Sequence, residues 1–319
     1  MSLTLVFKES FPLYIERLSG DFTVHEAPDG LARLASDIAS AVDVLITSGS
    51  AGATRADIAA LPKLGLICTV GTGYEGIDLE ACRERGILVT HAAGLNAPVV
   101  ADHAFGLLIA IVRDIPRADA VARAGGWRTG LTGRPMLGGK HIGIVGLGGV
   151  GRAIGRRAAG FDMTVSYFAR AAKDAPGWNW VGSVKDLAAQ VDFLVCTLPG
   201  DASTFHMIGA EVLDALGPAG FFVNVGRGST VDTQALVAAL KDDRIAGAGL
   251  DVFENEPGVP ESLCNLPNVV LTPHTAGGAP EINLLSAELI IRNLRGWQDG
   301  SGLISPIPEM REAASPSRR

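Results

Sequence analysis

Short apolar runs alternate with helix-compatible segments along the first hundred residues. The apolar runs at residues 3–7, 42–46, 66–70 and 86–90 predict buried strands. Residues 31–41, 55–60 and 79–85 predict helices between them. Strands that alternate with helices form parallel sheets, so this pattern predicts a small parallel α/β unit.

A glycine loop lies in the middle of the chain. Residues 142–145 form a short apolar run, and residues 152–159 are compatible with a helix. Between them Gly146, Gly148 and Gly151 have the G-x-G-x-x-G spacing. In that motif the first glycine permits a tight turn, the second lets the backbone approach a pyrophosphate, and the third lets the helix pack against the strand. Because the helix N-terminus also attracts the anion, this order predicts a dinucleotide-binding site.

A second alternating series surrounds the glycine loop. A long, mostly apolar helix is expected at residues 99–117, strands at 164–168, 193–197, 221–225, 247–250 and 269–272, and helices at 184–190, 210–216 and 233–241. A last helix from 280 to about 294 can return the chain to the N-terminal unit, and residues 309–319 are expected to be a frayed tail. We therefore expect an α/β fold with two doubly wound parallel-sheet domains. A Rossmann cofactor domain (98–279) is inserted into a flavodoxin-like substrate domain (1–97 and 280–319).

Composition narrows the class of protein. The 319 residues are 47% hydrophobic and 19% charged, with a net charge of −7, as in a globular protein without a surface for nucleic acid. The longest apolar stretch, residues 104–112, is too short to span a membrane, and the N-terminus lacks a signal-peptide core, so we expect a cytoplasmic protein. Cysteines without C-x-x-C spacing predict reduced thiols, and no metal site is expected; these cysteines are Cys68, Cys82, Cys196 and Cys264.

Candidate chemistry lies directly after three predicted strands, where ligands bind to parallel sheets. Arg227 offers a planar fork of donors for the carboxylate of a 2-oxo acid. His274 can protonate the substrate oxygen as hydride reaches the carbon, and a carboxylate should fix its tautomer and favour its protonated form. Glu256 is assigned to this role, although spacing alone does not separate it from Glu254. The other histidines are expected to be structural: His25, His91, His103, His141 and His206.

The chain resembles the D-isomer-specific 2-hydroxyacid dehydrogenases. Matching segments occur in the family's order at residues 70–78, 96–113, 143–151, 224–232, 247–257 and 273–274. The resemblance implies the catalytic trio Arg227, Glu256 and His274, and so favours Glu256 over Glu254. It also implies that the backbone N–H groups of Thr72 and Gly73 bind the substrate carboxylate.

The end of the second strand after the glycine loop indicates the kind of cofactor. NAD-specific folds place a carboxylate there, whereas this chain has Ala169 and then Arg170. Arg170 can pair with a 2′-phosphate, so we expect NADP(H). This segment is similar to that of the NADPH-dependent glyoxylate/hydroxypyruvate and hydroxyphenylpyruvate reductases, although Gly149 stands where many relatives carry arginine. Asp251 is expected to contact the nicotinamide edge. Further cofactor-binding residues are expected at Leu147, Gly149, Val150, Ala171, Leu198, Pro199, Val225 and Gly277.

These observations predict a reductase that converts a small 2-oxo acid, either glyoxylate or hydroxypyruvate or an aryl pyruvate, to the D-2-hydroxy acid. The apolar helix at 99–117 and the arm at 123–136 carry more apolar surface than a monomer tolerates, so a homodimer is expected. Two alternatives stay open, a corepressor-like protein that senses dinucleotides and an NAD-dependent dehydrogenase of formate or phosphite.

Overall fold

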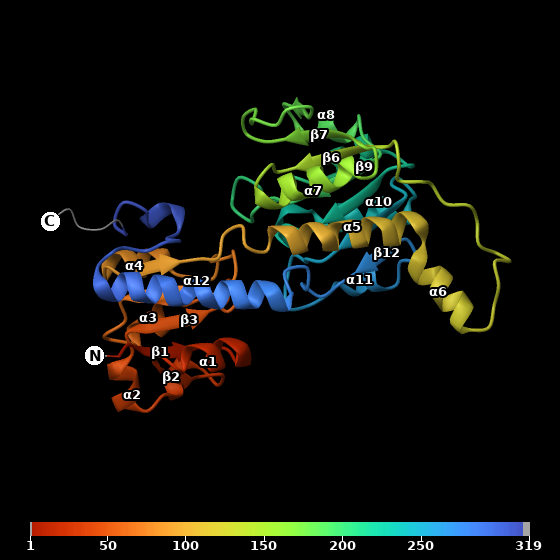
Figure 1. The fold of residues 1–319 in the computed structure, drawn as a ribbon. Helices are drawn as coiled ribbons and strands as arrows, with labels where there is room; N and C mark the ends of the chain where they lie inside the picture. Colours follow the sequence, from red (N-terminus) through yellow and green to blue (C-terminus); the bar gives the residue numbers. More distant parts are fainter. Residues whose placement is uncertain (1, 315–319) are drawn as a thin grey trace. The chain divides into compact units, whose positions relative to one another are not determined.

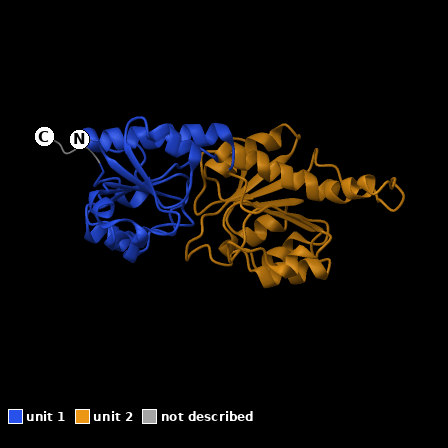
Figure 2. Cartoon of the chain, turned by 90° about the horizontal axis from the view of Figure 1, so that it is seen from below, with its two compact units in different colours: residues 1–96, 278–319 blue, residues 97–277 orange. Residues whose placement is uncertain are grey.

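The protein consists of two compact α/β units. The computed structural model describes residues 2–314, of which 2–96 and 278–314 form unit 1 and 97–277 form unit 2 (Figure 2). Each unit is built on a parallel sheet, as the sequence predicted. The chain leaves unit 1 after Asn96 and returns to it at Gly278.

Unit 1 contains a five-stranded sheet in the order β2-β1-β3-β4-β5, the flavodoxin-like order. Its strands are β1 (Thr4–Phe7), β2 (Thr23–Glu26), β3 (Val44–Thr47), β4 (Leu66–Thr69) and β5 (Leu88–Thr90). The connecting helices are α1 (Pro12–Leu18), η1 (Leu31–Arg33), α2 (Ser36–Ala41), α3 (Arg55–Ala59) and α4 (Leu79–Glu84). Residues in β3 and β4 are completely buried, which explains why their sequences are continuous apolar runs closed by threonine.

The returning helix α12 (Pro280–Asp299) completes unit 1 (Figure 1). Ile290, Ile291 and Leu294 pack in one cluster with residues of β1, β3 and β4. Ser286 donates a hydrogen bond from its hydroxyl to the carbonyl oxygen of Val70 at 2.7 Å, directly after β4. The helix therefore belongs to the core of the unit that begins with the N-terminus.

The segment after α12 is ordered, contrary to the tail expected at residues 309–319. Thr90 of β5 and Pro306 form an antiparallel bridge, and η3 (Pro308–Met310) follows. Met310 and Ala314 are 5% and 6% exposed. Burial of these apolar side chains gives residues 309–314 a fixed place, so the prediction of fraying is wrong for them. Residues 315–319 lie outside the described residues.

Unit 2 contains a seven-stranded parallel sheet in the order β12-β11-β10-β9-β6-β7-β8. The strands are β6 (His141–Val145), β7 (Thr164–Phe168), β8 (Asn179–Val181), β9 (Phe193–Cys196), β10 (Phe221–Asn224), β11 (Gly247–Leu250) and β12 (Val269–Leu271). The helices are α5 (Ala97–Arg113), α6 (Ile115–Arg123), α7 (Gly149–Ala159), α8 (Val184–Ala188), α9 (Ala210–Leu216), α10 (Thr233–Lys241) and α11 (Glu261–Cys264), with η2 at Gly228–Thr230. The strand order reverses between β6 and β9, the point at which doubly wound sheets bind ligands.

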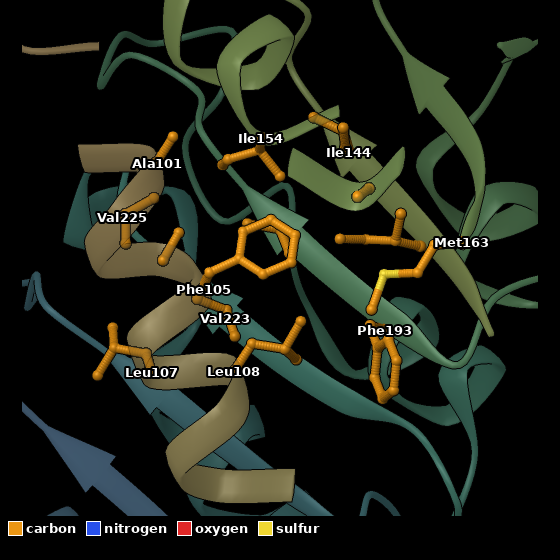
Figure 3. Packing of buried hydrophobic residues seen from close by; sticks show 14 of the residues in the cluster. Ala101, Phe105, Leu107, Leu108, Ile144, Ile154, Met163, Phe193, Val223 and Val225 are labelled. Carbon is orange, nitrogen blue, oxygen red and sulfur yellow. The ribbon is translucent and has the colours of Figure 1, made fainter. Parts of the chain in front are cut away.

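The apolar helix α5 is buried against the sheet of its own unit. Figure 3 shows Phe105 and Leu108 packed among side chains from the sheet and α7, including Val223 and Ile154. The close approach needs glycines in β11, because a Cβ at Gly249 would lie 2.9 Å from Cβ of Leu107. An element of the same chain therefore covers most of the apolar surface of this helix.

Two predicted helices are interrupted. The helix expected at 99–117 ends at Arg113, because Asp114 is left-handed (φ 56°) and α6 starts afresh at Ile115. A continuous helix would place the ring of Pro116 against the carbonyl group of Val112. The helix expected at 31–41 is two pieces, η1 and α2, separated by the extended residues Leu34 and Ala35. Within residues 2–314, no helix combines the length and apolar character needed to cross a membrane.

Candidate active site

The glycine loop joins β6 to α7 with the backbone geometry that its sequence predicted. Gly146 has a φ of 101°, and a Cβ at Gly151 would lie 2.1 Å from the carbonyl oxygen of Gly146. A Cβ at Gly148, in contrast, would meet no atom within 4 Å. Gly148 is also the N-cap of α7 and provides no side-chain hydrogen bond to the helix. The loop therefore leaves open space beside uncapped N–H groups, which fits the pyrophosphate of a dinucleotide.

The end of β7 carries the residues expected beside the ribose of the cofactor. Ala169 is 8% exposed, and its carbonyl oxygen accepts a hydrogen bond from Trp180 Nε1 at 3.0 Å. Arg170 is exposed. Hydrogen bonds from Ser203 are the chief cause of the lowered pKa of Asp201, and the positive charge of Arg170 contributes to the same shift. The strand end thus combines a fixed backbone with an accessible guanidinium group.

The other expected cofactor residues lie on the glycine loop and at strand ends of the same sheet. Leu147 and Leu198 are buried, whereas Gly149 and Ala171 are exposed. Thr197, at the end of β9, donates a hydrogen bond from Oγ1 to the carbonyl oxygen of Gly146 at 2.7 Å and ties the two loops together. The rest of the set is placed at the start of α7, after β9, after β10 and in the turn after β12: Val150, Pro199, Val225 and Gly277.

Hydrogen bonds to its backbone hold Arg227 in the loop after β10. Its carbonyl oxygen accepts hydrogen bonds from Nδ2 of Asn224 at 3.0 Å and from Oγ1 of Thr230 at 2.6 Å. Oδ1 of Asn224 accepts a third hydrogen bond from the N–H of Gly226 at 3.0 Å. Sequence reasoning missed Asn224, although a polar residue 1% exposed at the end of an apolar strand is a usable signal. This network of hydrogen bonds fixes the backbone position of Arg227, from which its side chain extends.

Asp251 follows β11 and is 1% exposed. Its Oδ1 accepts hydrogen bonds from Oγ1 of Thr272 at 2.6 Å and from the N–H of Thr275 at 2.9 Å. Its Oδ2 accepts from the N–H of Ala276 at 3.0 Å. Nε2 of His103, on α5, lies 2.8 Å from Oγ1 of Thr272. The carboxylate therefore holds the turn after β12, and its contact with a nicotinamide stays a prediction.

His274 lies in that turn and pairs with Glu256. Its Nδ1 is 2.6 Å from Oε2 of Glu256, whose Oε1 accepts the N–H of Phe253 at 2.9 Å. Because a carboxylate only accepts hydrogen bonds, Nδ1 carries the hydrogen. The side chain of His274 is 46% exposed and its backbone is left-handed, with a φ of 53°. Among residues 2–314 its Nε2 has no hydrogen-bond partner, so this nitrogen is available to a ligand.

Glu254, the alternative that spacing left open, does not contact His274. Its Oε1 lies 2.6 Å from Nε2 of His206, and its Oε2 accepts the hydroxyl of Thr233 at 2.8 Å. The structure therefore gives the two carboxylates different partners.

Thr72 and Gly73 lie in a braced loop of unit 1, after β4. Oγ1 of Thr72 lies 3.0 Å from Oδ1 of Asn96, and Nδ1 of His91 donates to the carbonyl oxygen of Thr72 at 3.1 Å. A Cβ at Gly49 would lie 2.6 Å from the carbonyl carbon of Gly73, so two loops of unit 1 touch through their backbones. Hydrogen bonds and backbone contacts within unit 1 therefore hold this loop, and a held loop can present backbone N–H groups to an anion.

Titratable side chains of the site do not gather as metal ligands do. In the part of the chain that the structure describes, no group of three or more His, Cys, Asp or Glu side chains could hold a metal ion.

Comparisons with known proteins identify the family. Residues 105–276 match the family model "D-isomer specific 2-hydroxyacid dehydrogenase, NAD binding domain". Hydroxyphenylpyruvate reductase of Plectranthus scutellarioides is 42% identical over 84% of this chain and 86% of its own length. A glyoxylate/hydroxypyruvate reductase A of Arabidopsis thaliana is 39% identical over 84% and 86%. The NADPH-dependent glyoxylate/hydroxypyruvate reductase of Sinorhizobium meliloti, solved with NADP and malonate, is 36% identical with a TM-score of 0.89, covering 100% of this chain and 98% of its own. The chain belongs to the D-isomer specific 2-hydroxyacid dehydrogenase family.

Proposed function

We propose that this oxidoreductase reduces a small 2-oxo acid, such as glyoxylate, hydroxypyruvate or an aryl pyruvate, to the D-2-hydroxy acid with NADPH. The observation that carries the proposal is the 2.6 Å hydrogen bond between Nδ1 of His274 and Glu256 at a strand end of the cofactor-type sheet. Relatives named glyoxylate/hydroxypyruvate and hydroxyphenylpyruvate reductases support the same reaction.

The cofactor is proposed to be NADP(H), which when bound supplies the hydride. The open N-terminus of α7 at Gly148 holds the pyrophosphate, and Gly146 and Gly151 keep the backbone close enough to reach it. Arg170 binds the 2′-phosphate, because the strand end offers a guanidinium group and no carboxylate. Binding of NADP by the relative from Sinorhizobium meliloti supports this assignment.

His274 is proposed to be the general acid. Glu256 holds the hydrogen of Nδ1, so the proton that is transferred leaves from Nε2. As hydride reaches the carbonyl carbon, the C=O π bond breaks and its electron pair takes that proton, which leaves the alcohol and a neutral imidazole. The carboxylate of Glu256 stabilises the imidazolium form before the transfer and keeps the ring oriented.

Arg227 is proposed to bind the substrate carboxylate. In unit 1, the N–H groups of Thr72 and Gly73 are proposed as carboxylate donors. The guanidinium group provides two parallel donors, and the hydrogen bonds to the Arg227 carbonyl oxygen keep the residue in place. The braced loop at Thr72 and Gly73 supplies donors without the cost of ordering a flexible segment.

We further propose a homodimer in a reducing compartment, the cytoplasm. Three large apolar side chains on α6 and the arm that follows it are exposed in unit 2: Ile115 at 48%, Trp127 at 79% and Met136 at 64%. A second copy of the chain would remove them from water. All four cysteines are free thiols, as expected in a reducing compartment.

The reaction is tested by mixing the purified protein with NADPH and each of several 2-oxo acids and following the absorbance of the reduced nicotinamide. Consumption of NADPH with formation of the D-2-hydroxy acid is the expected result. No consumption with any 2-oxo acid would contradict the proposal. Reduction of NAD by formate or phosphite would replace the proposal with the alternative dehydrogenase.

A further inference from the structure

Glu254 joins three segments of unit 2 through its side chain. Its Oε1 accepts a hydrogen bond from Nε2 of His206, in the segment after β9, at 2.6 Å. Its Oε2 accepts one from the hydroxyl of Thr233, the first residue of α10, at 2.8 Å. Glu254 itself belongs to the loop after β11, so one carboxylate ties this loop to two other places in the fold.

The loop that carries Arg227 lies between these segments. A Cβ at Gly228 would lie 1.9 Å from the carbonyl carbon of Phe253 and 2.4 Å from the nitrogen of Glu254. On its other side, the N–H of His206 donates to the carbonyl oxygen of Ser229 at 3.0 Å. The backbones of the three loops therefore touch, and a shift of one would displace its neighbours.

The contacts of Glu254 are those of an ionised carboxylate. Partial burial opposes ionisation, but the hydrogen bonds from His206 and Thr233 outweigh it and lower the pKa of Glu254. The side chains of His206 and Glu254 are 33% and 23% exposed, so water screens the pair only in part. Hydrogen bonds to an ionised acceptor are about twice as strong as neutral ones, which suits an anchor.

Glu256 depends on the same loop. Its Oε1 accepts the N–H of Phe253 at 2.9 Å, and its Oε2 contacts Nδ1 of His274 at 2.6 Å. Residues 253–256 thus form a short closed loop, with Glu254 as the anchor on one side and Glu256 as the contact with the histidine on the other. We propose that Glu254 is a positioning residue that holds Glu256 at hydrogen-bonding distance from His274. The inference rests on the proposed function in treating His274 as the acid.

Two substitutions test the anchor without removing the loop. Glu254→Gln keeps the size of the side chain but replaces the carboxylate with a neutral amide. His206→Asn removes the partner instead, and asparagine tolerates the left-handed backbone of this residue, which has a φ of 50°. The control is Glu261→Gln, which removes an exposed carboxylate from α11 in the same region.

The first measurement is the proton NMR resonance of the Nδ1–H of His274, which a short hydrogen bond shifts downfield and which His274→Ala identifies. The second is steady-state kinetics with NADPH. In both test variants we expect this resonance to broaden or disappear and kcat to fall about 10-fold, with unchanged KM for NADPH. Glu261→Gln should resemble the wild-type protein in both measurements.

The outcomes separate this inference from the proposed function. If the resonance and kcat stay at wild-type values in both variants, the inference is wrong. It is equally wrong if stability and kcat fall while the resonance persists, because Glu254 would then be structural only. If the wild-type protein shows the resonance but no reductase activity, loss of the resonance in both variants would support the positioning role and refute the proposed function. If Glu254→Gln does not fold, His206→Asn decides.

Discussion

The hydroxyl of Thr272 donates a hydrogen bond to Oδ1 of Asp251 across 2.6 Å and joins the ends of two neighbouring strands. The same carboxylate accepts hydrogen bonds from the N–H groups of Thr275 and Ala276. The backbone carbonyl oxygen of Asp251 accepts a hydrogen bond from the N–H of His274 at 2.8 Å. The buried side chain of Asp251 therefore holds residues on both sides of His274. This arrangement stabilises a turn whose central residue has a left-handed backbone that most residues avoid.

Asp251→Asn should destabilise the protein. The N–H groups of Thr275 and Ala276 donate to different oxygens of the Asp251 carboxylate. Asparagine keeps only one of these oxygens, so its NH₂ group would face one of the two N–H donors. One unsatisfied buried group costs about 1–3 kcal/mol in the free energy of unfolding, which urea titration measures. Asp242→Asn, at a carboxylate 68% exposed, is the control and should change the free energy by less than about 0.5 kcal/mol. Equal stability of the two variants would contradict this account of the turn.

His274→Ala should lower kcat by about 10²–10⁴-fold, because the proton that neutralises the developing alkoxide would come from water. Glu256→Gln should lower kcat less, since the imidazole remains but loses its ionised partner. Steady-state kinetics with NADPH and glyoxylate measure both effects. An unchanged kcat in His274→Ala would reject the assignment of this residue as the acid.

Two glycines of the same loop should respond in opposite ways to a methyl group. Gly151→Ala places a Cβ 2.1 Å from the carbonyl oxygen of Gly146 and should destabilise the fold by about 1–3 kcal/mol. Gly148→Ala meets no protein atom within 4 Å, so the fold should keep its stability. Its methyl group would instead occupy the space proposed for the pyrophosphate and raise the Kd for NADPH about 10-fold or more. Thermal unfolding and cofactor titration distinguish the two, and an unchanged Kd in Gly148→Ala would argue against this pyrophosphate position.

Arg170→Ala should raise KM for NADPH about 10- to 100-fold, the range expected for loss of a charge-assisted hydrogen bond. KM for NADH should hardly change, because NADH lacks the 2′-phosphate. Lys173→Ala serves as the matched control, since it removes another exposed positive charge from the same segment. Equal effects on NADPH and NADH would show that Arg170 does not discriminate the phosphate.

The strands that sequence reasoning found are those with continuous apolar runs. β3 and β9 are completely buried, so their apolar runs are continuous. β2 and β8, which sequence reasoning missed, are edge strands with exposed or half-exposed residues. β2 and β8 pair on one side only and bury little apolar surface, so their sequences carry no strong pattern. β5 and β12 are also edge strands, but their apolar sequences made them predictable.

In the site, too, some features follow from the local sequence, whereas others depend on tertiary contacts. The rule that ligands lie beyond strand ends was enough to select Arg227 and His274. It could not separate Glu254 from Glu256, because the direction of each side chain depends on partners distant in sequence, such as His206 for Glu254. Asp251 was expected to face the cofactor, and its hydrogen bonds to the turn after β12 only become visible when the sheet brings β11 and β12 together.

The stability of unit 1 should fall when the pH drops below about 6.5, the ordinary pKa of histidine. Burial lowers the pKa of His91 in the folded protein, although the Thr72 carbonyl opposes this shift. Above pH 6.5 both folded and unfolded states hold neutral His91, so its contribution is complete there. Below that pH the unfolded state takes up a proton that the folded state does not accept until its own lower pKa is reached, so unfolding is favoured.

The comparison of His91→Asn with the wild-type protein isolates this contribution. Asparagine keeps a donor for the carbonyl oxygen of Thr72 but does not titrate. Asp57 and Asp192, whose pKa values are lowered from 3.8, titrate below this range and do not interfere. Urea unfolding at pH 7.5 and 5.5 (roughly one unit either side of the ordinary histidine pKa) should show a larger loss of stability in the wild-type protein than in His91→Asn. Equal losses would mean that His91 is protonated as readily in the folded protein as in the unfolded chain.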